Sequence, residues 1–457
     1  MAGSGPSGSE AALAAPQEAA IVAIGREIAA ALPPPSRRPL QILDAKVNAV
    51  VADDAELRAA LFRFVDVMPA CRTAAEVVGH LLAYLRGVPS LPLALRLANR
   101  LGALPPARPL VAAGAGLSVR HLARRFIAGE RPGDAAATLE ALWRSGIASS
   151  VDLLGEATVT EEEADAYAAR CAATLEVLAR RAAAFPPQPR LEGDASGVLA
   201  RVNLSVKISA LTARLRPEAP EAGIADALVR LRSLLRLARA LGAHLHIDME
   251  SLDTRDAILT LVLGVLAEEE FADGPSAGLV LQAYLRDSAA ELDEILAFAG
   301  RVRRATPLVV RLVKGAYWDH EVTEARQHGW ETPVFVDKAR SDENFELLTR
   351  RLLAARPAVR VAIASHNLRS VAHAVAKSRE LGAPDSELEL QVLRGLGDEL
   401  ARGLSSLGLR VRVYSPVGDL VAGMAYLVRR LLENTSNESF LRAQARGVPI
   451  DELLVAP

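Results

Sequence analysis

The 457-residue sequence has little cysteine, few aromatic residues and no excess of charge of either sign. Its two cysteines, Cys71 and Cys171, lie far apart and lack the spacing of metal ligands, so we expect two buried or free thiols. The formal net charge of −2 leaves no basic footprint for nucleic acid, and we expect no such partner. Neither a secretory signal nor a long uninterrupted apolar run occurs, which favours a soluble cytoplasmic protein.

Hydrophobic residues make up 51% of the chain, enough for a large core. Residues 1–18 are rich in Gly, Ser, Ala and Pro, and we expect a disordered tail there. Between residues 19 and 148 apolar side chains recur at helical spacing, which predicts a helical arm without visible chemistry. In residues 149–457 the spacing of the apolar residues changes, and we expect this part of the chain to form one larger domain.

In this domain, short apolar runs rich in β-branched residues alternate with longer helical patterns. Alternating strands and helices predict a parallel sheet, and eight such units fit a closed (β/α)8 barrel of the TIM type. An open doubly wound sheet is the main alternative, although no G-x-G-x-x-G motif follows the first run. The eight expected strands are 150–156, 203–209, 243–250, 278–284, 308–315, 359–366, 387–394 and 409–415.

Polar residues lie in or just past each expected strand, where the carboxyl ends of barrel strands meet and where barrel enzymes hold their active sites. They are Glu156, Lys207, Asp248, Glu250, Gln282, Arg311, Lys314, His366, Asn367, Gln391 and Tyr414. Charges of both signs in a shielded mouth should form ion pairs, because unpaired buried charges are costly. A purely structural ring of salt bridges is the alternative to a catalytic site.

The last helical segment adds a second group of charges. Tyr426, Arg429, Arg430 and Glu433 are spaced three or four residues apart and share one face of a helix. The planar guanidinium of arginine suits a carboxylate, although a solvated basic patch is also compatible with this pattern.

The sequence also offers residues for two other kinds of site. His244 and His246 share a strand face with Asp248, which could suggest metal ligands, but histidines on such a strand are more often packing residues. Lys207 or Lys314 could serve as the Schiff-base lysine of an aldolase. Adjacent acids argue against this, since they keep such an amine charged.

Three segments closely resemble one family, the proline dehydrogenase domain of the bacterial proline utilization A flavoproteins. They are LSVKISAL at 204–211, RLVKGAYW at 311–318 and YLVRRLLEN at 426–434, supported by DLLGEA at 152–157 and SHN at 365–367. The resemblance covers residues 150–454 in order. It implies a barrel, with a C-terminal helix over the active site, that binds FAD. It also implies oxidation of L-proline to pyrroline-5-carboxylate, the first step of proline catabolism to glutamate, with electrons passed to a quinone.

The resemblance also assigns roles to matching residues. Lys207, Arg429 and Arg430 are expected to hold the proline carboxylate, with Glu156 and Asp248 as their ion-pair partners. The walls around the proline ring are expected from Leu312, Tyr317, Tyr414 and Tyr426. Arg311 is expected near flavin N5, and its positive charge would stabilise the reduced flavin.

Further positions match residues that contact FAD in the family. They are Val280, Gln282, Val313, Gly315, Ala316, Trp318, Lys338, His366, Asn367, Gln391, Glu433 and Ser439, with Asp248 beside them. Nothing in the sequence resembles an anchoring helix, so we expect any contact with the inner membrane to be peripheral, and the spacing of possible ligands predicts no metal site.

The sequence departs from the family in two places. Asp337 lies next to Lys338, where an acid would repel FAD phosphates, and Arg394 stands where histidine is common. The sequence ends where bifunctional relatives continue into an aldehyde dehydrogenase domain. We therefore expect either a separate pyrroline-5-carboxylate dehydrogenase partner or a missing domain.

Overall fold

Eight parallel strands form a closed barrel in the computed structural model, which describes residues 8–34, 54–155, 158–419, 423 and 447–457. Each expected strand overlaps one observed strand, so the barrel prediction is confirmed and the open sheet is excluded. In chain order the strands are β1 (Ile147–Leu153), β4 (Asn203–Lys207), β5 (His244–Asp248), β6 (Ser276–Gln282), β7 (Leu308–Val313), β8 (Val359–Ala364), β9 (Leu388–Leu393) and β10 (Arg410–Val417).

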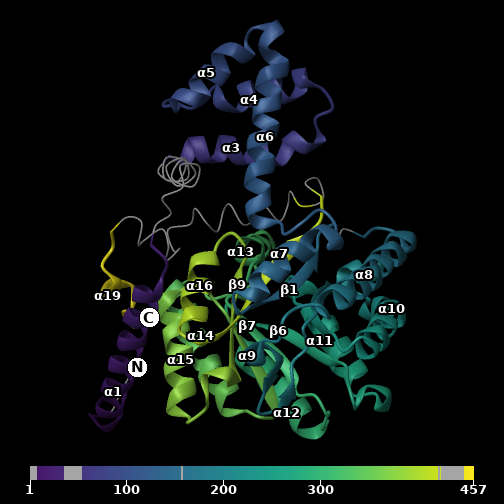
Figure 1. The fold of residues 1–457 in the computed structure, drawn as a ribbon, viewed down its shortest axis with the longest axis vertical. Coiled ribbons are helices and arrows are strands. Elements are labelled where there is room, and N and C mark those ends of the chain that lie inside the picture. The colour runs from purple at the N-terminus through teal and green to yellow at the C-terminus, as the bar shows by residue number, and fades with distance from the viewer. Residues whose placement is uncertain (1–7, 35–53, 156–157, 420–422, 424–446) are drawn as a thin grey trace.

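Helices follow the strands and surround the barrel, as Figure 1 shows. They are α8 (Glu161–Ala182), α10 (Pro220–Ala240), α11 (Leu252–Leu266), α12 (Ser288–Arg301), α13 (Trp318–His328), α14 (Lys338–Ala354), α15 (Leu368–Glu380) and α16 (Asp398–Ser406). The barrel closes where β1 pairs with β4 on one side and with β10 on the other.

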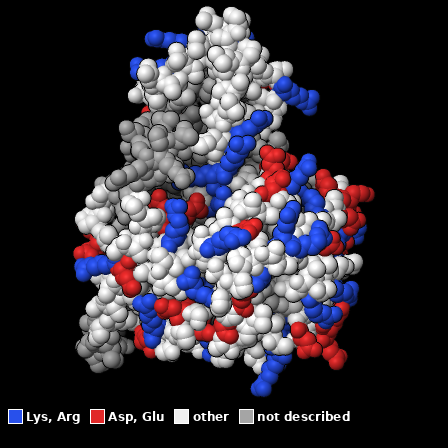
Figure 2. All heavy atoms as spheres, in the orientation of Figure 1, with Lys and Arg blue, Asp and Glu red and all other residues white. Residues whose placement is uncertain are grey.

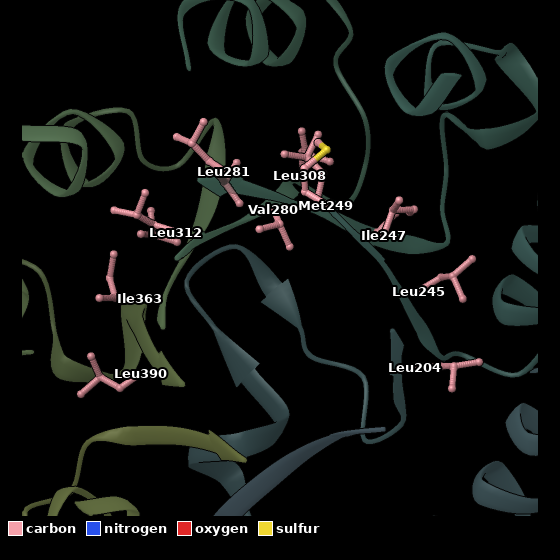
Figure 3. Close-up of a cluster of buried hydrophobic side chains, with 14 of the residues drawn as sticks. Leu204, Leu245, Ile247, Met249, Val280, Leu281, Leu308, Leu312, Ile363 and Leu390 are labelled. Carbon is pink, nitrogen blue, oxygen red and sulfur yellow. The ribbon is translucent and has the colours of Figure 1, made fainter. Parts of the chain in front are cut away.

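The two faces of the barrel strands differ in chemistry, because successive side chains point to opposite faces. Leu204, Leu245, Leu312 and Ile363 are fully buried and point from their strands towards the surrounding helices, while Val280 points to the other side of β6 (Figure 3). The inward positions are largely polar, whereas such barrels are usually filled by branched apolar residues.

At the amino ends of the strands, the interior is closed by buried ion pairs. Asp194, from the hairpin β2 (Gly193–Asp194) and β3 (Gly197–Val198), accepts hydrogen bonds from Arg360 at 2.8 and 3.0 Å and from Arg410 at 3.2 Å. Further along the barrel interior, the Glu389 carboxylate accepts hydrogen bonds from Arg412 at 2.8 and 3.0 Å. The charges satisfy one another inside the barrel, as burial requires.

A separate helical arm stands off the barrel (Figure 1). It consists of α3 (Ala55–Val67), α4 (Ala74–Leu85), α5 (Leu93–Gly102) and α6 (Arg108–Phe126), with its own core that includes Leu57, Phe64 and Leu81. Asp54 and Thr73 cap α3 and α4 with their side chains. The C-terminal end of α6 reaches the mouth of the barrel, where Ala128 N donates to Pro416 O at 2.8 Å.

The N-terminal helix differs from expectation. Helix α1 (Gly8–Ala31) begins inside the stretch expected to be disordered, and it packs against α15 and α16 of the barrel instead of joining the arm. Its sequence is rich in alanine, the best helix former, and Ile21 and Ile28 are buried. Arg369 of α15 links it to the C-terminal segment by bonding Glu18 and Leu454 O, each at 2.8 Å.

Among the described helices, none is both long enough and apolar enough to cross a bilayer.

Burial of Glu291 near the start of α12 leads to a pH prediction. Neither carboxylate oxygen has a hydrogen-bond partner among the described residues. Burial raises the pKa of Glu291 to about 8, against the charge of Arg255, which lowers it. The native state therefore retains a proton that the unfolded chain releases near its usual pKa. Stability contributed in this way is complete at low pH and is lost as pH rises through about 8.

We expect Glu291→Gln, which is neutral at every pH, to match wild type near pH 4, where the carboxyl is protonated in both states, and to exceed it by about 3–5 kcal/mol near pH 9. Denaturant unfolding at both pH values checks this, with the exposed Glu294→Gln as the control. A variant no more stable than wild type at high pH would contradict the account.

Candidate active site

Four of the residues expected at the barrel mouth lie together. Asp248, at the end of β5, accepts a hydrogen bond from Arg311 Nη1 at 2.8 Å and from the Tyr414 hydroxyl at 2.6 Å. Lys207 Nζ lies 3.7 Å from the same carboxylate. Asp248 therefore holds residues from β4, β7 and β10 in one cluster.

Asp152 is a fifth member that sequence reasoning missed. Its carboxylate accepts from Lys207 Nζ at 2.8 Å, and its side chain is only 2% exposed. Ser150 and Asp152 alternate along β1 on the inward face, a period of two that could have identified it. Two carboxylates around Lys207 favour its charged form, which argues against a Schiff-base role.

Tyr414 serves as a neutral donor in this cluster. Burial, reinforced by the nearby charges of Asp152 and Asp248, raises the pKa of Tyr414 well above its usual value. The phenol thus stays protonated and donates to Asp248. The guanidinium of Arg311 lies over its ring, 5.3 Å from the centroid.

Small polar groups support Arg311 from inside the barrel. Its Nη1 and Nη2 each lie 3.3 Å from Ser205 Oγ, and Nη2 lies 3.4 Å from Ser150 Oγ. Ser150 in turn donates to Asn203 Oδ1 at 2.7 Å. These neutral acceptors fix the guanidinium without neutralising it.

His244 and His246 lie deeper in the barrel. His244 Nε2 is 3.1 Å from His246 Nδ1, and His244 Nδ1 is 2.8 Å from Ser276 Oγ. Both ring nitrogens of His244 are therefore engaged with protein groups. Burial and the charge of Arg412 lower the pKa of His244 to about 3, so the ring is neutral at physiological pH.

The end of β6 provides an unpaired amide oxygen, and the loop after β7 provides an exposed stretch of backbone at Gly315. Gln282 is 2% exposed, and its Oε1 has no partner among the described residues, while its Nε2 donates to Glu250 O at 3.1 Å. Gly315 has a φ of +136°, and a Cβ there would lie 2.3 Å from the Tyr284 ring. Glycine is therefore required where the chain crosses Tyr284.

Lys314 and Lys338 share one acid. Asp342 accepts from both ammonium groups, at 2.6 Å from Lys338. Burial opposes the charge of Asp342, but the two lysines outweigh it and lower its pKa. Asp337, expected to disturb this region, caps α14 by accepting from Ala339 N at 3.0 Å, which explains an acid at that position.

The other expected cofactor residues lie on the loops around the mouth or in the barrel. His366 Nε2 accepts from Leu393 N at 2.9 Å, and Asn367 caps α15 through Ser370 N at 3.0 Å. Gln391 points into the barrel and donates to Glu389 at 2.6 Å. Trp318 donates from its indole to Phe335 O at 3.0 Å. Val280 and Val313 share the inward faces of β6 and β7 with Gln282 and Arg311, and Ala316 and Tyr317 precede α13.

The expected role of Leu312 was wrong. Leu312 is fully buried in the apolar layer between barrel and helices and cannot line a pocket at the mouth (Figure 3). Its neighbour Arg311 faces inward, so alternation along β7 sends Leu312 outward. Leu393, at the end of β9, is on the inward side as the register partner of Tyr414, and both pack against the apolar core of the arm; the sequence did not single it out.

Several expected site residues lie outside the described part of the chain. They are Glu156, Tyr426, Arg429, Arg430, Glu433 and Ser439.

The described residues fit a flavin. The unpaired Gln282 Oε1 can accept from an N–H at the edge of an isoalloxazine ring, and Arg311 Nε, also without a partner among the described residues, can donate to it. A buried acceptor and a buried donor left unpaired at one mouth call for a polar ligand. Lys338 and the exposed backbone at Gly315 can serve an extended anionic cofactor.

Two family models together match most of the chain. The proline dehydrogenase family model matches residues 135–443, and the proline utilization A N-terminal domain matches residues 18–126. The bifunctional protein PutA of Escherichia coli is 31% identical over 360 residues, which is 76% of this chain and 26% of that protein. Proline dehydrogenase 1 of Bacillus subtilis is 28% identical over 320 residues, covering 70% of this chain and 89% of that protein.

Solved structures give the same result. Proline utilization A from Bdellovibrio bacteriovorus, described as inactivated by N-propargylglycine, superposes with a TM-score of 0.87 at 36% identity. The match covers 96% of this chain and 44% of that one. The chain thus spans about a quarter of the bifunctional E. coli relative and less than half of the solved relative. Matches over both the barrel and the arm show that the chain belongs to the proline dehydrogenase family, in the form found in proline utilization A proteins.

Proposed function

We propose that the protein oxidises L-proline to pyrroline-5-carboxylate, with FAD as the acceptor of a hydride from proline C5. The observation that carries the proposal is the mouth cluster, in which Asp248 gathers Lys207, Arg311 and Tyr414 beside the unpaired amide oxygen of Gln282. The positive charges of Lys207 and Arg311 lie beside a polar group, Gln282 Oε1, that can bind a flavin. This arrangement suits the carboxylate of a small amino acid held next to the cofactor. Family membership supports the same reaction.

In this mechanism the barrel residues bind and orient. Lys207, held by Asp152, would take the proline carboxylate together with Arg429 and Arg430. Tyr414 and Leu393 would form part of the wall around the ring, with Tyr317 and Tyr426. Fixing the carboxylate and the ring places one C–H bond for transfer, which is how positioning lowers a barrier.

FAD, when bound, supplies the redox chemistry by accepting the hydride at N5. Arg311 would contribute a fixed positive charge at the flavin, where negative charge develops on reduction. Asp248 and the serines beneath prevent this guanidinium from turning away. The substrate amine must be neutral before hydride loss, and we propose that its proton leaves to solvent.

The proposal extends to the surroundings of the reaction. Reduced flavin would pass its electrons to a quinone, as part of proline catabolism to glutamate. The enzyme would work in the cytoplasm with peripheral contact to the inner membrane. A pyrroline-5-carboxylate dehydrogenase, as a separate partner or as a further domain, would consume the product.

The visible absorption spectrum tests the reaction. The purified protein should show oxidised flavin bands, and anaerobic L-proline should bleach them. A protein that binds no FAD, or a flavin that proline does not bleach, would refute the proposal. Trapping of a carbonyl substrate on Lys207 by borohydride would instead favour a lyase.

A substitution at Arg430 tests the carboxylate contact. We expect Arg430→Ala to raise the KM for proline at least about tenfold, since a charge-assisted hydrogen bond contributes about 1.5–3 kcal/mol. Steady-state kinetics with a dye acceptor would measure it, with Arg303→Gln on the barrel surface as the control. An unchanged KM would rule out this role.

A further inference from the structure

The apolar core of the arm continues into the mouth of the barrel. Phe126, the last residue of α6, is buried in one cluster with Leu154, which follows β1, and Leu396, which follows β9. Leu393 of β9 and Tyr414 of β10 pack against the same cluster. The arm therefore forms part of the surroundings of Tyr414, a residue of the proposed active site.

The last turn of α6 contacts the loop after β9 directly. Arg125 Nε donates to the carbonyl oxygen of Gly395 at 3.1 Å. Gly395 has a φ of +82°, and a Cβ at this position would lie 2.6 Å from Phe126 Cδ1. Glycine thus allows the loop backbone to lie against the Phe126 ring. Gly395 N also donates to Asp398 Oδ1 at 3.1 Å, at the start of α16, so the loop is held between two helices.

The same loop is bonded to Tyr414. Arg394 N donates to Tyr414 O at 3.0 Å, and Leu393 is the register partner of Tyr414 where β9 pairs with β10. The Tyr414 hydroxyl is fixed separately, by its 2.6 Å bond to Asp248. The contact of α6 with Gly395 and the bond from Arg394 therefore connect the end of the arm to the backbone of Tyr414.

The residues that follow α6 bind the end of β10 as well. Ala128 N donates to Pro416 O at 2.8 Å, and Gly418 N donates to Gly129 O at 3.0 Å. These bonds form a short parallel bridge beside β10. They hold the chain just beyond Tyr414, so the arm and its connection to the barrel contact both of the strands that meet at this residue.

We propose that the end of α6 positions Tyr414 for the proposed oxidation, with Phe126 and Arg125 as positioning residues that act through the loop after β9. In the proposed site Tyr414 forms part of the wall around the substrate ring, so a shift of its backbone changes how the ring is held against the flavin. The arm is then a structural part of the active site. The inference rests on the proposed function for the role of Tyr414, whereas the contact between arm and mouth is independent of it.

A cavity at the junction tests the proposal in the full chain loaded with FAD. Phe126→Ala removes the ring against which the loop lies, and we expect it to raise the KM for proline about tenfold or more, with a smaller change in kcat. An unreactive cyclic carboxylate, titrated while the flavin spectrum is followed, should bind more weakly by the same factor. Phe126→Leu fills most of the space and should restore most of the affinity.

Leu81→Ala is the matched control for a cavity in the arm. Leu81 is buried in the same cluster, but it lies on α4, which stands away from the barrel (Figure 1). Its replacement should destabilise the arm, as measured by denaturant unfolding, and should leave the KM for proline unchanged.

A second pair of variants leaves the apolar core intact and decides the question if Phe126→Ala does not fold. Arg125→Gln removes the bond to Gly395 O and should raise the KM about threefold. Arg124→Gln, at the adjacent exposed position, should not change it. Both variants remove one positive charge from an arm whose visible face in Figure 2 carries blue side chains and few red ones, so the effect on charge is matched.

Hydrogen exchange separates this inference from the proposed function, because it needs neither flavin nor proline. Phe126→Ala should speed exchange of the Arg394 amide, which bonds Tyr414 O, at least about tenfold, whereas Leu81→Ala should not. Equal KM values for Phe126→Ala and Leu81→Ala would overturn the proposal, whatever their exchange rates. If proline did not reduce the flavin of wild type but exchange differed as expected, the proposed function would fail and the positioning of Tyr414 by the arm would stand.

Discussion

Asp248→Ala is expected to lower kcat/KM for proline by about 100-fold or more. The carboxylate is the common partner of Arg311 and Tyr414, at 2.8 and 2.6 Å, and lies 3.7 Å from Lys207. Without it, the Arg311 guanidinium and the Tyr414 hydroxyl lose the carboxylate that orients them, while Lys207 keeps only Asp152. Stopped-flow reduction of the flavin by proline would measure the effect on the proposed reaction directly.

Two further variants separate orientation from charge. Asp248→Asn keeps a hydrogen-bond acceptor and should lose less activity than Asp248→Ala. Ser205→Ala removes only two long contacts of 3.3 Å from a neutral hydroxyl to the same guanidinium and should change the rate little. If Asp248→Ala reduced the flavin as fast as Ser205→Ala, Asp248 would not organise the site.

Asp194→Ala should produce the largest loss of stability, about 3–5 kcal/mol. The Asp194 side chain is 1% exposed and neutralises Arg360 and Arg410 inside the base of the barrel. Removing it leaves two buried cations without their carboxylate. Because the base is at the opposite end of the strands from the mouth, the folded variant should still oxidise proline at low temperature.

A surface pair provides the control. Asp451 bonds Arg26 at 2.8 Å, but both side chains are more than half exposed, so Asp451→Ala should change stability little. Unfolding in urea would compare the two variants. Equal midpoints for Asp194→Ala and Asp451→Ala would contradict the importance of the buried pairs.

The barrel could be predicted from sequence because its strands and helices have clearly different periods. Residues that point outward from the strands, such as Leu245 and Leu312, give each strand its short apolar run, and turns separate these runs from the helices. The helix α1 could not be predicted, since its alanine-rich start has the composition of a flexible tail. The position of α1 is set by its contacts with α15, such as the bond between Glu18 and Arg369. These two residues are 351 positions apart in the sequence, so the sequence pattern does not reveal their contact.

The mouth was predictable in part. Lys207, Asp248, Arg311 and Tyr414 end or nearly end their strands, where barrel chemistry is expected, and the structure brings them together. The resemblance points to Glu156 and gives no separate signal for Asp152, and it places Leu312 at the mouth although alternation along β7 sends that side chain outward. The pairing of Asp194 with Arg360 was beyond prediction, because it joins a short hairpin to a strand 166 residues away.

The most direct test of the central claim is a crystal structure of the protein with FAD and an unreactive cyclic carboxylate in place of proline. The account predicts that the carboxylate contacts Lys207 and Arg430 while its ring lies against the isoalloxazine, with Arg311 and Gln282 at the flavin edge. A flavin bound away from this cluster, or a carboxylate held in a separate cavity, would contradict it.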